Sequence, residues 1–223
     1  MHINLNRAQN ICINGTPLEN ITDFKYLGSV KTNDGSCSKD IKIRIAMAKH
    51  KMVELNNLWK DRGIPNELKV KLLKCLIWPV MIYGCEAWTL KKADINKIDA
   101  AEMWLYRRLL RVSWKAKRTN ASILEELNAS KQLSTYVSKR KLKYVGHVVR
   151  NTRTTLMASV LQGKIEGPRK KGRPPISYAE NILRVSGLSV AGVARECQDR
   201  EGWRRVVNSL GAAANIDPDD ADR

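Results

Sequence analysis

The acidic residues are considered first, because a polymerase or nuclease needs clustered carboxylates to hold Mg²⁺. Asp219 and Asp220 are adjacent, but they lie in a polar tail and do not follow a hydrophobic strand. Asp94, Asp99 and Glu102 are separated by five and three residues, which is typical of exposed charges along a helix. We therefore predict no metal site and no catalytic residue in this chain, and neither a Walker A motif nor a GxGxxG motif is present.

The histidines and cysteines show no pattern of a catalytic triad or a metal centre. His2, His50 and His147 are far apart, and none has a cysteine or aspartate nearby at the spacing of a ligand set. For His147 we favour a packed or capping role. The cysteines are odd in number, form no CxxC pair and indicate a reducing compartment, the cytosol or the nucleus. They are Cys12, Cys37, Cys75, Cys85 and Cys197.

One basic segment has the residue types that contact nucleic acid. Residues 167–175 read GPRKKGRPP, in which the backbone is flexible before Arg173 and stiff after it. An extended arginine of this kind can enter a narrow minor groove, and the segment resembles an AT-hook core. A nuclear localisation signal and a plain linker are the alternatives. The cations of this candidate nucleic-acid-binding segment are Arg169, Lys170, Lys171 and Arg173.

The charge of the chain is positive and uneven. The 223 residues contain 40 Lys and Arg against 22 Asp and Glu, a net charge of +18. Residues 131–184 alone contain 13 basic and 2 acidic side chains, a local excess of +11. A field of this sign attracts polyanions, because neutralised phosphates release their counterions. We expect nucleic acid as the partner, with an acidic protein or a membrane surface as the lesser alternatives.

Composition also excludes several classes of protein. A hydrophobic content of 43% suffices for a buried core and excludes a wholly disordered chain. No run of about 18 uncharged apolar residues is present, so we expect no membrane-spanning helix. The first ten residues lack the apolar segment of a signal peptide, and we expect a nuclear or cytoplasmic protein that is not secreted.

Strands are predicted only near the start of the chain. Asn14-Gly15, flanked by apolar residues, is a strong signal for a two-residue β-hairpin. Residues 24–30 continue as a second β element that Gly28 interrupts, and residues 32–35 form a turn.

The next element is a helix of about 20 residues, which Ser36 or Ser38 is expected to cap. Apolar residues at spacings of four and three form one stripe along it. They are Ile41, Ile45, Ala48, Met52, Leu55 and Trp59. The cations on the other face are expected to point outward. They are Lys42, Arg44, Lys49, Lys51 and Lys60.

Helices are predicted over most of the remaining chain, so the fold class is mainly α. A helix that begins near Asn66 is expected to turn Leu68, Leu72, Leu73 and Leu76 inward. Pro79 interrupts it, and the uncharged residues that follow are expected to be buried.

Further helices are predicted at about 92–112, 121–128, 131–150, 176–186 and 189–210. Thr119-Asn120 is expected to cap the second of these, where Ser122 and Glu125 also have the spacing of a capping box. The last helix is expected to break at Gly202. Gly146 is expected to mark close backbone packing. Residues 163–175 contain three Gly and three Pro and are the clearest linker.

Several segments, taken in order, point to one family. They are ICINGTPLENITDFKYLGS, DGSCSKDIKIRIAMA, WPVMIYGCEAW, RRLLRVSWKAKRTNASIL, LKYVGHVVR, KKGRPP and EGWRRVV. This ordered series covers about residues 10–210. It resembles the C-terminal part of the reverse transcriptase of non-LTR (LINE-type) retrotransposons.

The resemblance implies roles for two groups of residues. FKYLGS at 24–29 is similar to the primer grip, a β-hairpin at the palm–thumb junction that holds the primer's 3′ end. The matching residues are Phe24, Tyr26, Leu27 and Gly28. The helices that follow would form the thumb, whose basic face tracks the template–primer duplex. Its candidate nucleic-acid-binding residues are Lys42, Arg44, Lys49 and Lys51.

The resemblance also implies a division of the chain. Residues 1–30 would be the palm edge with the primer-grip-like hairpin, and residues 31–115 a helical, thumb-like bundle. Residues 116–162 would form a basic helical region after the thumb, followed by the basic Gly/Pro linker at 163–175. Residues 176–223 would hold C-terminal helices and a frayed tail.

The family's catalytic motif, an aromatic-Ala-Asp-Asp turn on a palm strand, should precede Ile11, but the ten residues before it contain no acid. We therefore expect no polymerase activity from this chain and no cofactor, since Mg²⁺ would belong to the missing palm. We expect a fragment that binds RNA, DNA or both, without a membrane or a small-molecule substrate. A host-adopted DNA-binding or adaptor protein and a nonfunctional remnant are the alternatives.

Overall fold

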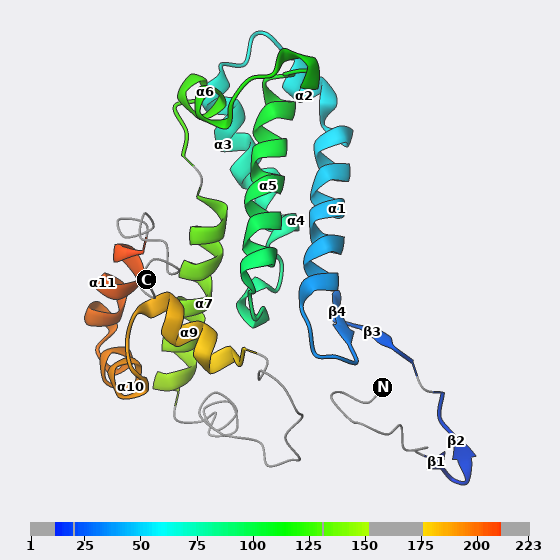
Figure 1. Ribbon diagram of the computed structural model, residues 1–223, viewed down its shortest axis with the longest axis vertical. Helices are drawn as coiled ribbons and strands as arrows, with labels where there is room; N and C mark the ends of the chain where they lie inside the picture. Colours follow the sequence, from blue (N-terminus) through cyan, green and yellow to red (C-terminus); the bar gives the residue numbers. More distant parts are fainter. Residues whose placement is uncertain (1–11, 20, 131, 152–175, 211–223) are drawn as a thin grey trace. The chain divides into compact units, whose positions relative to one another are not determined.

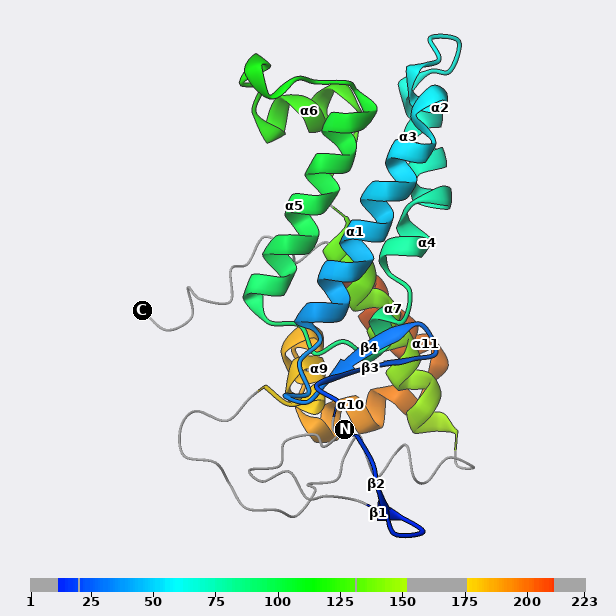
Figure 2. The same cartoon turned by 90° about the vertical axis from the view of Figure 1, so that its right-hand side faces the viewer.

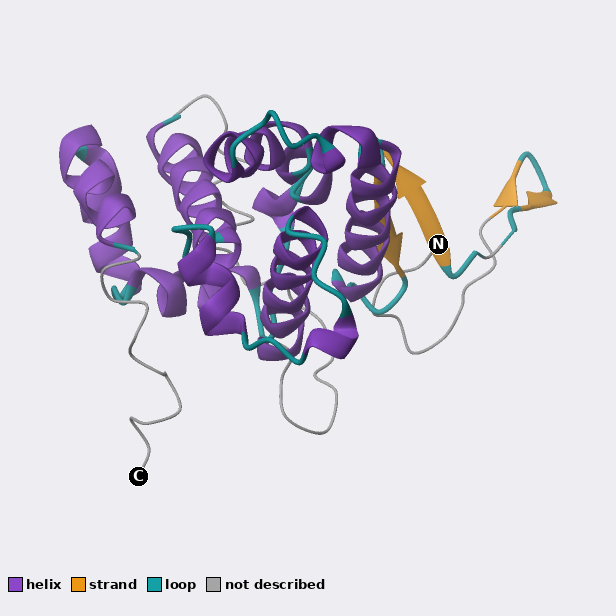
Figure 3. Ribbon diagram, turned by 90° about the horizontal axis from the view of Figure 1, so that it is seen from above, coloured by secondary structure: helices purple, strands orange, loops and turns teal. Residues whose placement is uncertain are grey.

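The computed structural model describes residues 12–19, 21–130, 132–151 and 176–210 (Figure 1). Its contacts divide the chain into two compact units. The N-terminal unit falls within Met1–Gly84 and Asn96–Asn128, and the C-terminal unit within Cys85–Ile95 and Ala129–Arg223. Figure 3 shows a mainly helical chain whose strands belong to the N-terminal segment, which confirms the predicted fold class.

Two short antiparallel hairpins open the described chain. β1 (Cys12–Ile13) pairs with β2 (Thr16–Pro17). Asn14 and Gly15 between them have φ values of 50° and 80°, as a type I′ turn requires, which confirms this hairpin.

The second β element is a complete hairpin. β3 (Asp23–Tyr26) pairs with β4 (Ser29–Thr32), with Tyr26 opposite Ser29. Leu27 and Gly28 between them again have positive φ values of 46° and 79°. Gly28 therefore lies at the turn and reverses the chain, where the sequence had suggested a simple interruption.

The helix of about 20 residues predicted after the turn at 32–35 is divided in two. α1 (Ser38–Glu54) ends before Leu55, and α2 (Asn56–Lys60) follows it. Cys37 rather than a serine stands at the N-cap position, and its side chain makes no capping hydrogen bond. Ser36, one of the two predicted capping residues, accepts a hydrogen bond of 3.2 Å from the backbone N–H of Ser38 in the first turn of α1. The predicted stripe is confirmed in its central members. Ile41, Ala48, Met52 and Trp59 are buried, and Ile45 and Leu55 are half-buried.

α3 (Asn66–Leu76) turns a different face inward than predicted. Leu73 is buried and Leu72 half-buried, but Leu68 and Leu76 are exposed. The buried face continues from Leu73 to Ile77 and into α4 (Trp78–Met81). Pro79 lies in the first turn of α4. The packing of the apolar residues after residue 76 therefore decides which face of α3 points inward.

α5 (Lys92–Leu109) begins in the C-terminal unit and continues in the N-terminal unit. The prediction that Asp94 and Glu102 are exposed was wrong, because both are buried. Glu102 accepts a hydrogen bond of 3.1 Å from the hydroxyl of Tyr106, which is also buried. Burial and the neighbouring Glu102 raise the pKa of that hydroxyl.

A short 3₁₀ turn (Trp114–Ala116) leads to α6 (Asn120–Glu126). The side chain of Thr119 accepts a hydrogen bond of 3.2 Å from the backbone N–H of Ser122, which confirms the predicted cap. Arg107 on α5 donates to the carbonyl of Arg118 at 2.7 Å and ties this loop to α5.

The C-terminal unit contains α7 (Leu133–Arg150), α9 (Tyr178–Ser186), α10 (Val190–Gln198) and α11 (Arg200–Ser209). These helices share one apolar core. Its buried members are Leu142, Val145, Ile182, Val193, Cys197, Trp203 and Val207.

The predicted break at Gly202 was wrong, because the chain breaks at Asp199. The carboxylate of Asp199 accepts hydrogen bonds from the backbone N–H groups of Glu201 (2.9 Å) and Gly202 (2.8 Å). It therefore caps α11, and Gly202 lies in the first turn, where an added Cβ would come 2.7 Å from Oδ2 of Asp199.

Residues 85–95, with a 3₁₀ turn at Cys85–Ala87, pack against helices that come much later in the sequence. The hydroxyl of Tyr178 donates to the carbonyl of Glu86 at 2.8 Å. Asn181 and Arg184 both donate to the carbonyl of Leu90, at 3.0 and 3.1 Å. α9 thus supplies these three hydrogen bonds, and Arg140 on α7 adds an ion pair with Glu86.

Several sequence predictions lie outside the described residues. These are the linker at 163–175 with Arg169, Lys170, Lys171 and Arg173, the pair Asp219 and Asp220, and His2. Among the helices that the structure describes, none combines the length and the apolar character needed to cross a membrane.

Candidate nucleic-acid interface

The β3–β4 hairpin is attached to the N-terminal half of α1, as Figures 1 and 2 show. Two contacts come from residues one helical turn apart. The buried carboxylate of Asp40 accepts a hydrogen bond of 2.9 Å from the backbone N–H of Val30. The guanidinium of Arg44 donates to the carbonyl of Gly28. The spacing of four places both side chains on the face of α1 that meets the hairpin.

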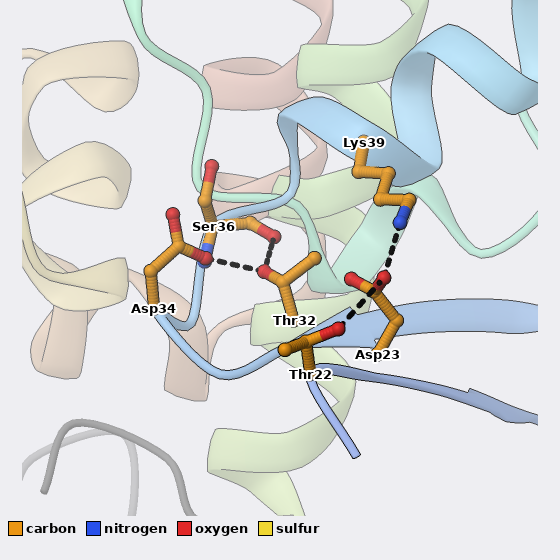
Figure 4. A network of polar contacts seen from close by, with 6 residues as sticks. All are labelled: Thr22, Asp23, Thr32, Asp34, Ser36 and Lys39. Atoms are coloured by element: carbon orange, nitrogen blue, oxygen red, sulfur yellow. Dashed lines mark hydrogen bonds and ion pairs between the residues drawn. The ribbon is translucent and has the colours of Figure 1, made fainter.

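The base of the hairpin is held by the polar network in Figure 4. Lys39, in the first turn of α1, forms an ion pair with Asp23 at the start of β3. Thr32 at the end of β4 donates to Asp34 and to the carbonyl of Ser36. These contacts fix where β4 ends and α1 begins.

The turn of the hairpin is held by Tyr83, which follows α4. Its hydroxyl donates to the carbonyl of Leu27 at 3.3 Å, and its ring lies 4.4 Å from the guanidinium carbon of Arg44. A Cβ added at Gly28 would lie 3.4 Å from Arg44 Nη2 and 3.5 Å from Tyr83 Cε1. These are ordinary van der Waals contacts, so the packing would accept a Cβ, and it is the positive φ of 79° that favours glycine at this turn.

The other surface of the hairpin carries exposed apolar side chains. Phe24 is 46% exposed, Tyr26 58% and Leu27 76%. The rings of Phe24 and Tyr26 are stacked, with centroids 6.4 Å apart and planes at 26°. Exposed aromatic faces on an anchored backbone can stack with nucleic-acid bases.

The cations of α1 are not all on its outer face. Lys42 is exposed, as predicted, but Arg44 is only 6% exposed, so its predicted outward orientation was wrong. Arg44 lies between Ile41 and Ala48 on the buried face, because the hairpin and Tyr83 cover that side of the helix.

Two further predicted cations of α1 have partners. Lys49 is half-buried, with its amine 5.1 Å from the ring centroid of Trp104 on α5. Lys51 pairs with Glu54 at 2.8 Å, and this hydrogen bond is the largest cause of the lowered pKa of Glu54. Lys42 is therefore the candidate cation of α1 best placed to meet a phosphate.

The cysteines and acids give this interface no metal site. Among the described residues, no three His, Cys, Asp or Glu side chains are grouped as ligands. The five cysteines are free thiols. Burial raises the pKa of Cys85 to about 12 and that of Cys197 to about 11, so both stay protonated and unreactive near neutral pH.

Sequence reasoning missed the anchoring residues Asp40, Arg44 and Tyr83. A cation and an acid four residues apart on a helix are usually exposed, and the sequence offers no sign that the hairpin covers them. Gly28 was the available signal, because glycine readily takes the positive φ that a tight hairpin turn needs.

Comparison with known proteins points to the origin of the chain. The chain is 24% identical over 204 residues to a Caenorhabditis elegans protein named as an uncharacterized transposon-derived protein. The aligned region covers 86% of this chain and 72% of the Caenorhabditis elegans protein. No family model and no solved structure matches the chain. The similarity indicates that this chain is of transposable-element origin.

Proposed function

We propose that the chain is a nucleic-acid-binding part of a non-LTR retrotransposon reverse transcriptase, in which the β3–β4 hairpin holds the primer strand near its 3′ end. The observation that carries the proposal is the anchored hairpin with exposed Phe24, Tyr26 and Leu27. The motif resemblance at 24–29 and the transposon-derived relative support it.

The anchors matter physically because a free two-stranded hairpin is marginally stable in water. Asp40, Arg44 and Tyr83 contact the backbone of the hairpin from its covered side. The exposed rings are therefore already ordered before a ligand arrives, which lowers the entropy cost of binding.

We propose that this chain binds without polymerising. Its 223 residues contain no aromatic-Ala-Asp-Asp sequence, and two Mg²⁺ ions need such paired carboxylates for phosphoryl transfer. The proposed partners are RNA, DNA or a hybrid of the two. Lys42 and the basic segment with Arg169, Lys170, Lys171 and Arg173 would supply phosphate contacts.

Fluorescence anisotropy with the full chain tests the proposal. The two ligands are a duplex with a recessed 3′ end and a blunt duplex of the same paired sequence. We expect tighter binding to the recessed end, and we expect the double variant Phe24→Ala/Tyr26→Ala to lose that preference. The loss should be about 1–3 kcal/mol for each stacked base.

Tyr136→Ala is the matched control, because Tyr136 is an aromatic residue on α7 with 44% exposure. It should keep the preference for the recessed end. A wild-type chain that binds both duplexes equally well contradicts the proposal.

A further inference from the structure

We infer that the C-terminal unit has a binding site for the phosphate backbone of a nucleic-acid duplex, in a cleft between α7 and α11. The inference deepens the proposed function and rests on it for the class of ligand. The cleft has a volume of about 610 Å³. α7 and the residue after it contribute Lys143, His147, Arg150 and Asn151. α11 contributes Arg200, Trp203, Arg204 and Val207.

Helical spacing explains why these side chains meet. Lys143, His147 and Arg150 are separated by four and three residues, so they share one face of α7. Arg200 and Arg204 are four residues apart on α11 and share one face in the same way. His147 is exposed in this cleft, so of the two expected roles, packed or capping, the packed one was wrong. Its place in the last turn of α7 is compatible with the other.

The floor of the cleft is formed by a close contact between the two helices. Trp203 is 3% exposed, and its indole N–H donates to the carbonyl of Leu142 at 2.8 Å. A Cβ added at Gly146 would lie only 2.3 Å from Nε1 of this indole. Gly146 therefore allows Trp203 to reach the α7 backbone, which brings the cationic faces of α7 and α11 together.

The charges of the cleft are not neutralised. Lys143, Arg200 and Arg204 are exposed and form no ion pair with any described residue. Arg150 donates to the carbonyl of Cys197 at 2.7 Å, a contact that orients the guanidinium and leaves its charge in place.

The acids near α11 do not reach the cleft. Asp199 caps the helix and lies 3.9 Å from Arg205, and no acidic side chain is among the described lining residues. Like charges held together by the fold favour the binding of an anion.

The dimensions favour an extended polyanion over a single phosphate ion. Lys143 and Arg150 are seven residues apart, a span of about 10 Å along α7. Successive phosphates of one strand advance about 3.4 Å along the duplex axis, so a row of cations of this length can contact more than one phosphate. Backbone contacts of this kind are independent of sequence.

The experiment compares two double variants of the full chain by fluorescence anisotropy on a blunt DNA duplex across a salt series. Arg200→Ala/Arg204→Ala removes two charges from the cleft. The control, Arg195→Ala/Arg205→Ala, removes two exposed arginines of the same unit that do not line the cleft. Circular dichroism checks that both variants fold.

We expect the cleft variant to bind the duplex at least several-fold more weakly. The slope of log affinity against log salt should fall by about 2, since each phosphate contact contributes about 0.9. The control variant should change the slope by much less. Equal effects of the two variants, or an unchanged slope in the cleft variant, would overturn the inference, because the binding would then reflect net charge alone or another surface.

Vesicles of phosphatidylcholine with phosphatidylserine test the other class of polyanion. A cleft variant that loses vesicle binding and keeps duplex binding also overturns the inference. The outcomes separate this inference from the hairpin proposal. Loss of recessed-end preference concerns the hairpin, whereas a loss of affinity and salt slope on blunt duplex concerns the cleft.

Discussion

At the scale of single residues, Arg44 is a cation that the sequence predicts on the surface but that the fold buries against the hairpin. The residue is only 6% exposed, and its guanidinium donates to the carbonyl of Gly28 and lies over the ring of Tyr83. Its Nε has no hydrogen-bond partner among the described residues, so the desolvation of the cation is only partly offset. Such a residue fixes the position of a neighbouring backbone at some cost in stability.

We predict that Arg44→Met destabilises the attachment of the hairpin by about 2–3 kcal/mol, the combined size of a charged hydrogen bond and a partly buried cation–π contact. Hydrogen exchange of the β3–β4 amides should accelerate in this variant. Lys42→Met, on the exposed face of α1, should change stability by no more than about 0.5 kcal/mol. Equal exchange rates in the two variants would show that Arg44 does not hold the hairpin.

At the scale of elements, the contact between α7 and α11 depends on a glycine, Gly146, which has no side chain to block it. Gly146 lies in the interior of α7, where alanine would usually be the better helix former by up to about 1 kcal/mol. The position of Trp203 reverses this preference, because the added methyl group would overlap the indole.

We predict that Gly146→Ala lowers the free energy of unfolding of the C-terminal unit by about 1–3 kcal/mol through overpacking. In a Trp203→Phe background the same substitution should cost less, since the smaller ring leaves room for the methyl group. A double-mutant cycle in urea measures this coupling. Additive changes in the free energy of unfolding would mean that the two side chains do not interact.

The start of α11 is a second feature at this scale, and it predicts a dependence on pH. Hydrogen bonds from the backbone N–H groups of Glu201 and then Gly202 lower the pKa of Asp199. A carboxyl group with a lowered folded-state pKa contributes stability above its unfolded pKa of about 3.9, and this is lost as pH falls through the folded value.

We therefore expect the cap to weaken on acidification below about pH 4. Asp199→Asn, which keeps a capping oxygen but does not titrate, should remove this part of the acid sensitivity. Urea unfolding between pH 5 and 3 compares the two chains. A variant with the same acid sensitivity as the wild type would exclude Asp199 as its source.

At the scale of the whole molecule, each of the two units has its own exposed surface that we propose to contact nucleic acid. The N-terminal unit presents stacked aromatics on an anchored hairpin, and the C-terminal unit presents a cationic cleft. Neither unit has a described group of acids arranged to hold a metal ion.

We predict that the purified chain extends no primer in the presence of Mg²⁺ or Mn²⁺, although it binds the primer–template. The reason is the lack of paired palm aspartates in its 223 residues. A gel assay with labelled primer measures extension, and the Phe24→Ala/Tyr26→Ala variant reports whether binding alone has changed. Nucleotide incorporation that persists through purification and depends on a residue of this chain would contradict the prediction.

Local features of the sequence determined where most elements lie. The Asn14-Gly15 turn, the Thr119 cap and the stripe from Ile41 to Trp59 were predicted because turn geometry, capping and helical periodicity depend on near neighbours along the chain. The fold class followed from them.

Only the tertiary structure decided which charged side chains are covered and which leucines are left exposed. Arg44, Asp94 and Glu102 are buried and Leu68 is exposed, contrary to what their chemical types favour. The cleft cations Lys143 and Arg204 are far apart in sequence and meet only because Gly146 admits Trp203. Burial and charge clustering depend on which distant segments pack together, and that choice is a property of the whole fold rather than of any local pattern.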